Sequence, residues 1–155
     1  MNCRFDTIGD EKLLDLPKVA FLSSMKFTSE QQAKVQAWTA EIAKQNKCVI
    51  SGFKCKLEFE VFKTLANKNK CKLILVLARG IYEELPYPYQ QLVNAGRLLI
   101  ITPFAQEQTD SRRDFAYIRN HIVAEMADEI IAGAITPGGQ IEKVLLESEK
   151  PYSVL

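Results

Sequence analysis

The sequence has little of what a protein metal site needs, because it contains one histidine and four cysteines. A structural zinc ion takes four converging sulfur or nitrogen ligands, often with two of them in a C-x-x-C pair. Cys3, Cys48, Cys55 and Cys71 form no such pair, and His121 is the single histidine that could complete a set. We therefore expect no metal and no cofactor, and reduced thiols in a cytoplasmic protein.

Long apolar runs and an excess of charge of one sign are also lacking. No stretch approaches the roughly 20 apolar residues that cross a membrane, and residues 1–10 have no apolar core of a secretory leader. The 20 basic and 19 acidic residues nearly cancel, so no long-range field attracts nucleic acid or a membrane. The sequence predicts one soluble domain, in which a local patch must bind any anionic partner.

Short apolar runs alternate with longer amphipathic segments, which is typical of repeated β-α-β units. Because the runs are apolar throughout, they predict strands buried on both faces, hence an α/β fold with a mostly parallel sheet of about six strands between two helical layers. Strands are predicted at residues 18–22, 48–50, 73–77, 98–101, 129–132 and 152–155. Helices are predicted from Ser29 to about 46, at 57–65, through Leu92 and Val93, from 110 or 111 to Met126, and at about 140–148. Residues 18–155 form the predicted domain, and residues 1–17 a lead-in arm.

Small, hydroxyl-bearing and basic residues follow four of the predicted strands. The carboxyl ends of parallel strands share one edge of a sheet, where the first turn of the next helix presents unpaired N–H groups to an anion. Glycine allows close approach of the backbone, hydroxyls donate to phosphate oxygens, and cations supply charge. The candidate phosphate-binding residues in these loops are Ser23, Ser24, Ser51, Gly52, Lys54, Arg79, Gly80, Gly138 and Gly139. Any one loop taken alone could equally be a plain turn.

Three further side chains could add to such a site. Arg112 and Arg113 fall in the first turn of the predicted long helix, where a cation opposes the helix dipole unless an anion binds nearby. The alternative is solvated charge at a helix end. Phe53 follows a predicted strand and could either stack on a nucleobase or plug the core.

The sequence lacks both common nucleotide-binding signatures, G-x-G-x-x-G and G-x-x-x-x-G-K-[ST]. Their glycines and lysine are what let a first loop bind a pyrophosphate or a nucleoside triphosphate. The sequence therefore gives no basis for predicting the binding of nicotinamide dinucleotides or Walker-type hydrolysis of nucleoside triphosphates.

The order of motifs along residues 18–147 resembles the Rossmann-like domain of the DprA/Smf DNA-processing proteins, within the SLOG superfamily. The matching segments are 19–24 (VAFLSS), 50–52 (ISG), 74–80 (ILVLARG), 96–103, Arg119-Asn120 and 137–139 (PGG). The resemblance implies a site for single-stranded DNA or nucleotide phosphates, a homodimer, and a role in loading recombinase on incoming DNA. By matching position, the implied site residues are Ser23, Ser24, Ser51, Gly52, Arg119, Asn120, Gly138 and Gly139.

The sequence also departs from the family pattern. The family's first loop reads Gly-Ser-Arg, whereas Ser23, Ser24 and Met25 stand here, with Lys26 as the nearest cation. Its second loop runs toward Gly-x-Asp, whereas residues 53–56 read FKCK. With 155 residues, we expect no winged-helix module. We therefore predict a stand-alone domain that binds a nucleotide or single-stranded DNA and is not an enzyme.

Two alternatives remain open at the level of sequence. The LOG-type phosphoribohydrolases of the same superfamily carry PGGxGTxxE, of which residues 137–139 match, while Ile141, Glu142 and Leu145 stand at the Gly, Thr and Glu positions. Hydrolysis of a glycosidic bond needs a carboxylate, which Glu142 or Glu58 would supply. The second alternative is a partner-binding module that has kept the fold without a ligand.

Overall fold

Seven strands form one sheet in the computed structural model, which describes residues 4–68 and 70–155. The spatial order is β1-β5-β4-β3-β2-β6-β7, and β1 alone among these seven strands runs antiparallel to its neighbour. The strands are β1 (Asp6–Ile8), β2 (Lys18–Leu22), β3 (Cys48–Ser51), β4 (Lys72–Val76), β5 (Leu98–Thr102), β6 (Glu129–Ala132) and β7 (Tyr152–Val154). The prediction of an α/β fold with a mostly parallel sheet is confirmed.

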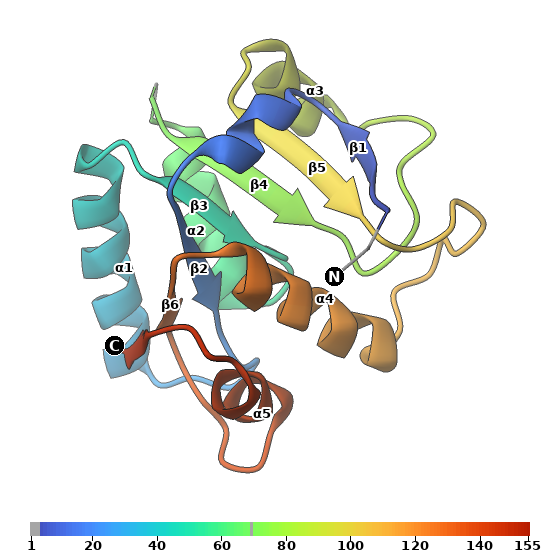
Figure 1. Cartoon of the computed structure of the whole chain (residues 1–155). Coiled ribbons are helices and arrows are strands. Elements are labelled where there is room, and N and C mark those ends of the chain that lie inside the picture. The colour runs from blue at the N-terminus through green and yellow to red at the C-terminus, as the bar shows by residue number, and fades with distance from the viewer. Residues whose placement is uncertain (1–3, 69) are drawn as a thin grey trace.

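Helices cover both faces of this sheet (Figure 1). Helices α1, α2 and α3 pack on one face, and the 3-10 helix η1, α4 and α5 pack on the other. Their bounds are η1 (Glu11–Asp15), α1 (Ser29–Lys44), α2 (Lys56–Ala66), α3 (Tyr87–Asn94), α4 (Arg113–Met126) and α5 (Gln140–Glu147). Within the described residues, no helix is long and apolar enough to cross a membrane.

Each central strand contributes side chains to two apolar clusters, one on each face. In β2, Ala20 and Leu22 join the cluster under α4 and α5, while Val19 and Phe21 join the cluster under α1 and α2. This alternation follows from the two-residue period of a strand. It explains why the strands are apolar at successive positions, as the sequence indicated.

The structure corrects the predicted boundaries in three places. The lead-in arm contains β1, whose residues pair with β5 at the edge of the sheet. Helix α1 is capped by Thr28, one residue earlier than predicted, through a capping box with Gln31. Helix α4 starts at Arg113 because residues 110–112 remain extended or irregular. Cys48, Cys55 and Cys71 are unpaired thiols, and Cys3 lies outside the described residues.

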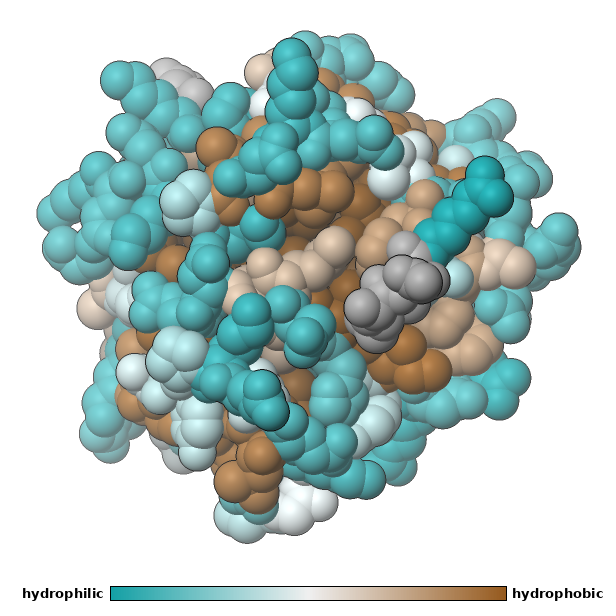
Figure 2. All heavy atoms as spheres, viewed as in Figure 1, coloured by the Kyte–Doolittle hydropathy of each residue, from teal (hydrophilic) through white to brown (hydrophobic). Residues whose placement is uncertain are grey.

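The face of the molecule that carries η1 and α4 is apolar at its centre and hydrophilic around it (Figure 2). The strand residues beneath this face, such as Ile74 and Ile101, are fully buried.

Candidate functional site

The loops after β2 and β3 are joined by the buried side chain of Glu58, in the first turn of α2. Its Oε2 accepts from the backbone N–H of Ser23 and its Oε1 from that of Lys54, each at 3.1 Å. Only 3% of Glu58 is exposed. Two neighbouring strand ends are thus fixed to each other by one carboxylate.

The side chain of Arg119 reaches the same place from the opposite face of the sheet. Arg119 is 6% exposed, and its Nε donates to Oδ1 of Asn120 at 2.8 Å. Its guanidinium lies against Gly52, where an added Cβ would be 2.2 Å from Nη1. A side chain at residue 52 would therefore displace the arginine.

Burial dominates the charge states of this buried pair. It raises the pKa of Glu58, against the opposing effects of Arg119 and of the backbone donors Lys54 and Ser23. It also lowers the pKa of Arg119, against the effect of Glu58. Burial likewise raises the pKa of Cys55, the residue that precedes α2, to about 12. The Cys55 thiol is therefore protonated, and it donates to the Ser23 carbonyl at 3.4 Å.

The serines of the predicted site accept hydrogen bonds from backbone N–H groups of the surrounding loops. Ser23 Oγ accepts from the N–H of Ala134 at 3.2 Å, and Ser24 Oγ accepts from that of Thr136 at 2.9 Å. Ser51 Oγ accepts from the N–H of Phe53 at 3.1 Å within its own loop. All three serines are buried. Ser23 and Ser24 hold the loop between β6 and α5 against the end of β2, and Ser51 fixes the loop that follows β3.

Phe53 belongs to the core, contrary to the base-stacking alternative. Its φ is 46°, a left-handed value that is unusual for a residue with a Cβ, and this turns the ring inward. The ring is 4% exposed and packs on Phe62 with 5.2 Å between centroids. No face of the ring is open to a nucleobase. Lys54, the next residue, is exposed at the loop surface.

Arg79 and Gly80 do not join the other candidates. Arg79 lies over the ring of Tyr82, with its Cζ 4.5 Å from the centroid. The N–H of Gly80 donates to the carbonyl of Gln108 at 2.7 Å, and a Cβ there would be 2.3 Å from the carbonyl oxygen of Ala105. Gly80 thus serves close packing of two loops.

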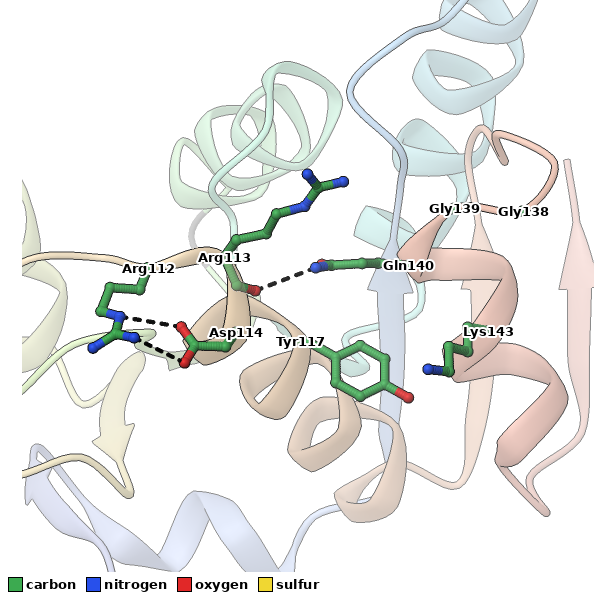
Figure 3. Close-up of a pocket in the computed structure, with 8 residues that line it drawn as sticks. All are labelled: Arg112, Arg113, Asp114, Tyr117, Gly138, Gly139, Gln140 and Lys143. Atoms are coloured by element: carbon green, nitrogen blue, oxygen red, sulfur yellow. Dashed lines mark hydrogen bonds and ion pairs between the residues drawn. The ribbon is translucent and has the colours of Figure 1, made fainter.

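An open pocket of about 690 Å³ lies between the N-terminal turns of α4 and α5 (Figure 3). Gln140 crosses from α5 and donates to the carbonyl of Arg113 at 3.2 Å. Lys143 Nζ lies 5.1 Å from the ring centroid of Tyr117. The lining residues are Arg112, Arg113, Asp114, Tyr117, Gly138, Gly139, Gln140 and Lys143.

The pocket combines positive charge with an uncapped helix start. Arg112, Arg113 and Lys143 supply three cations against the carboxylate of Asp114, which pairs with Arg112 at 3.3 Å. Gly139 precedes α5 and has no side chain to accept from the first N–H groups of the helix. Such a pocket can bind the oxygens of a phosphate.

The candidate residues therefore divide between two structural roles. Arg112, Arg113, Gly138 and Gly139 line the pocket. Ser23, Ser24, Ser51, Gly52, Arg119 and Asn120 are buried and hold the surrounding loops. Sequence reasoning missed Tyr117, Gln140 and Lys143. A usable signal existed for the last two, because residues three apart on the helix after Gly139 share one face.

The two carboxylates of the hydrolase alternative are both engaged by backbone donors. Glu142 Oε1 accepts from the N–H of Gly138 at 3.1 Å, at the edge of the pocket. Glu58 is buried and accepts from the N–H groups of Ser23 and Lys54. Within residues 4–68 and 70–155, no group of histidine, cysteine or acidic side chains could hold a metal ion.

Comparisons with known proteins point to one family. A family model described as DNA recombination-mediator protein A matches residues 5–144. No curated protein matches the chain in sequence. Solved structures extend the likeness in fold across nearly the whole chain.

Two of the similar structures are DNA processing protein A from Helicobacter pylori and from Streptococcus pneumoniae. The first, whose structure concerns single-stranded DNA binding, is 20% identical with a TM-score of 0.76, over 97% of this chain and 70% of that one. The second is 19% identical with a TM-score of 0.74, over 97% of this chain and 54% of that one. This chain therefore spans about half the length of the S. pneumoniae protein.

The molybdenum cofactor carrier protein of Chlamydomonas reinhardtii is also similar in fold. It is 16% identical with a TM-score of 0.59, over 90% of this chain and 76% of that one. One arrangement of strands and helices thus serves proteins with different ligands.

Proposed function

The chain belongs to the DNA recombination-mediator protein A family, and from this premise we propose that it binds single-stranded DNA by its phosphates in the pocket between α4 and α5. The observation that carries the proposal is one pocket that Arg112, Arg113 and Lys143 line together with the uncapped start of α5. Arginine forks and helix N–H groups match phosphate oxygens in both charge and geometry.

The buried contacts of Ser23, Ser24 and Arg119 support the proposal, because they fix the loops and the helix that form the walls of the pocket. Ser23 and Ser24 hold the loop that leads to Gly138 and Gly139, while Arg119 anchors α4 against Gly52. A binding site whose walls are already ordered loses less conformational entropy when the ligand arrives. The family-motif residues would then act on DNA through the shape of the pocket.

The biological setting is proposed on the family resemblance. A recombination-mediator domain would receive incoming single-stranded DNA in the cytoplasm, during DNA processing or uptake, and pass it to a recombinase. We also propose a homodimer, which sedimentation equilibrium at several concentrations would test. A monomer at all concentrations would exclude it.

Fluorescence anisotropy with a labelled oligothymidylate, titrated at several salt concentrations, tests DNA binding. We expect affinity to fall linearly on a log-log plot against salt, with a slope of about −0.7 for each phosphate neutralised. Arg113→Ala and Lys143→Ala should each weaken binding and reduce the slope by about 0.7. Absence of binding at low salt would overturn the proposal.

Lys44→Ala provides a matched control. Lys44 is an exposed cation in the last turn of α1, at the opposite end of the strands, where it pairs with Glu41. Its removal changes net charge as the pocket variants do, and it should leave the affinity unchanged. An equal loss of affinity in all three variants would show that binding depends on net charge and not on the pocket.

A further inference from the structure

Four aromatic side chains form a continuous strip across α2, α3 and the loop that follows β4, which we call the aromatic strip. Phe59 stacks on Phe62 with 6.2 Å between centroids, and Phe62 meets Tyr89 edge-on at 5.6 Å. Tyr89 then lies 6.2 Å from Tyr82. Figure 1 shows α2 and α3 behind the sheet, on the face opposite α4 and α5.

The aromatic strip carries a cation at each end. Lys63 Nζ lies 5.3 Å from the centroid of Phe59, and Arg79 Cζ lies 4.5 Å from that of Tyr82. Phe59 is 42% exposed and Tyr82 and Tyr89 are half-buried, while Phe62 is 4% exposed and packs in the core beneath them. The strip therefore presents Phe59, Tyr82 and Tyr89 to solvent. Packing in the core explains Phe62, but it explains neither the exposure of Phe59 nor the two flanking cations.

We propose that the aromatic strip is a second contact surface for single-stranded nucleic acid, beyond the pocket. The exposed rings of the strip, Phe59, Tyr82 and Tyr89, offer stacking surface to bases. Lys63 and Arg79 bind the phosphates that flank these bases. Aromatic rings interleaved with cations are the usual means of holding a single strand without sequence preference. That this nucleic acid is single-stranded DNA rests on the proposed function.

The position of Arg79 places one end of the aromatic strip at the edge of the sheet that carries the pocket. Arg79 follows β4, so it stands at the same edge of the sheet as the loops that form the pocket. The aromatic strip starts at that edge and continues along α3 and α2. A strand that leaves the pocket along the edge reaches Arg79 first.

Two exposed acidic residues allow a test of whether the strip binds DNA or a basic peptide. Glu83 and Glu84 directly follow Tyr82 and repel phosphates at that end of the strip. Replacing both by glutamine should tighten binding of a long oligonucleotide by severalfold. If the strip instead binds a basic peptide, the same double variant leaves DNA affinity unchanged, and that result would overturn the proposal.

Two oligothymidylates, of about 5 and about 30 nucleotides, separate the strip from the pocket. We expect Phe59→Ala to weaken binding of the long strand about tenfold and to leave the short strand unaffected. Tyr152→Ala, at an exposed aromatic on the β7 edge, is the matched control and should affect neither. Lys63→Glu, at an exposed site on α2, should weaken the long strand as well and keeps the test valid if Phe59→Ala fails to fold.

The outcomes for the two sites are distinguishable. If Arg113→Ala weakens both strands and neither strip variant weakens the long one, the aromatic strip is excluded while the pocket stands. If the strip variants weaken the long strand and Arg113→Ala has no effect, the strip stands and the proposed pocket fails. Absence of binding by the unaltered protein to either strand would exclude both.

Discussion

The guanidinium of Arg119 occupies the space that a side chain at residue 52 would fill. The three atoms of Arg119 nearest to a Cβ built on Gly52 lie 2.2, 2.4 and 2.6 Å away. Gly52 directly follows β3 and Arg119 comes from α4, so this contact joins the two faces of the sheet at its carboxyl edge. Glycine is required here for space.

Gly52→Ala should therefore destabilise the protein, by about 1–3 kcal/mol, the usual cost of overpacking a buried site. Urea denaturation measures this change. In an Arg119→Ala background the clash is gone, so the same substitution should cost much less. An equal cost in both backgrounds would contradict the contact.

Glu58→Gln should change how stability depends on pH. Burial raises the pKa of Glu58 above its ordinary value of 4.5, so the folded protein holds this proton when the unfolded chain has lost it. The stabilisation associated with the raised pKa is complete below pH 4.5 and is lost as pH rises through the folded pKa. The slope in this window is at most about 1.4 kcal/mol per pH unit.

Denaturation midpoints measured from about pH 4 upward test this prediction. The unaltered protein should lose stability relative to Glu58→Gln as pH rises above about 4.5, because glutamine cannot ionise. Glu149→Gln, at an exposed position, is the control and should run parallel to the unaltered protein. Parallel curves for Glu58→Gln would show that the buried carboxylate keeps an ordinary pKa.

The sequence predicted the central sheet well because each buried strand is apolar at consecutive positions. It missed β1, whose three residues are partly exposed and are ordered by pairing with β5. No local pattern could show this, since the stabilising partner lies more than 90 residues away along the chain. Helix α4 began later than expected for a similar reason, because Arg112 remains extended.

The sequence predicted which loops form the candidate site, but not which of their residues line the pocket and which are buried and hold the loops in place. Ser24 and Gly138 look equally suitable for phosphate in the sequence, yet Ser24 is buried and bonds the backbone of Thr136, whereas Gly138 lines the pocket. The sequence allowed Phe53 either to stack on a base or to pack in the core, and the structure places its ring in the core. Tyr117 and Lys143 meet only because α4 and α5 pack together.

Glu142→Gln should tighten DNA binding. Its carboxylate accepts from the N–H of Gly138 and places negative charge at the edge of the pocket. Removing that charge should strengthen phosphate binding by about 0.3–1 kcal/mol, roughly two- to fivefold. Anisotropy titrations at low salt measure the change.

The same variant also tests the hydrolase alternative. If Glu142 were a catalytic carboxylate, the unaltered protein would release free base from nucleoside monophosphates and Glu142→Gln would abolish the release. We expect no release from either protein. Tighter DNA binding without any hydrolysis would assign Glu142 to the electrostatics of the pocket.

Gly139→Asp and Gly139→Ser, compared as a pair, test whether the start of α5 binds the phosphate. Gly139 has φ −86° and ψ 178°, which any residue adopts, and an added Cβ would lie 3.0 Å from the carbonyl oxygen of Thr136. Either side chain can cap α5, a gain of about 1 kcal/mol that this close contact partly offsets. Both variants should therefore fold with nearly unchanged stability.

Their effects on binding should differ because only aspartate brings a charge. In Gly139→Asp the introduced carboxylate would take the N–H groups of α5 and repel the phosphate, so affinity should fall more than about tenfold. In Gly139→Ser the hydroxyl competes for the same N–H groups without repulsion and should weaken binding far less. Because both side chains cap the helix, equal affinities in the two variants would mean that the phosphates do not approach α5, and the DNA would have to bind elsewhere on the carboxyl edge.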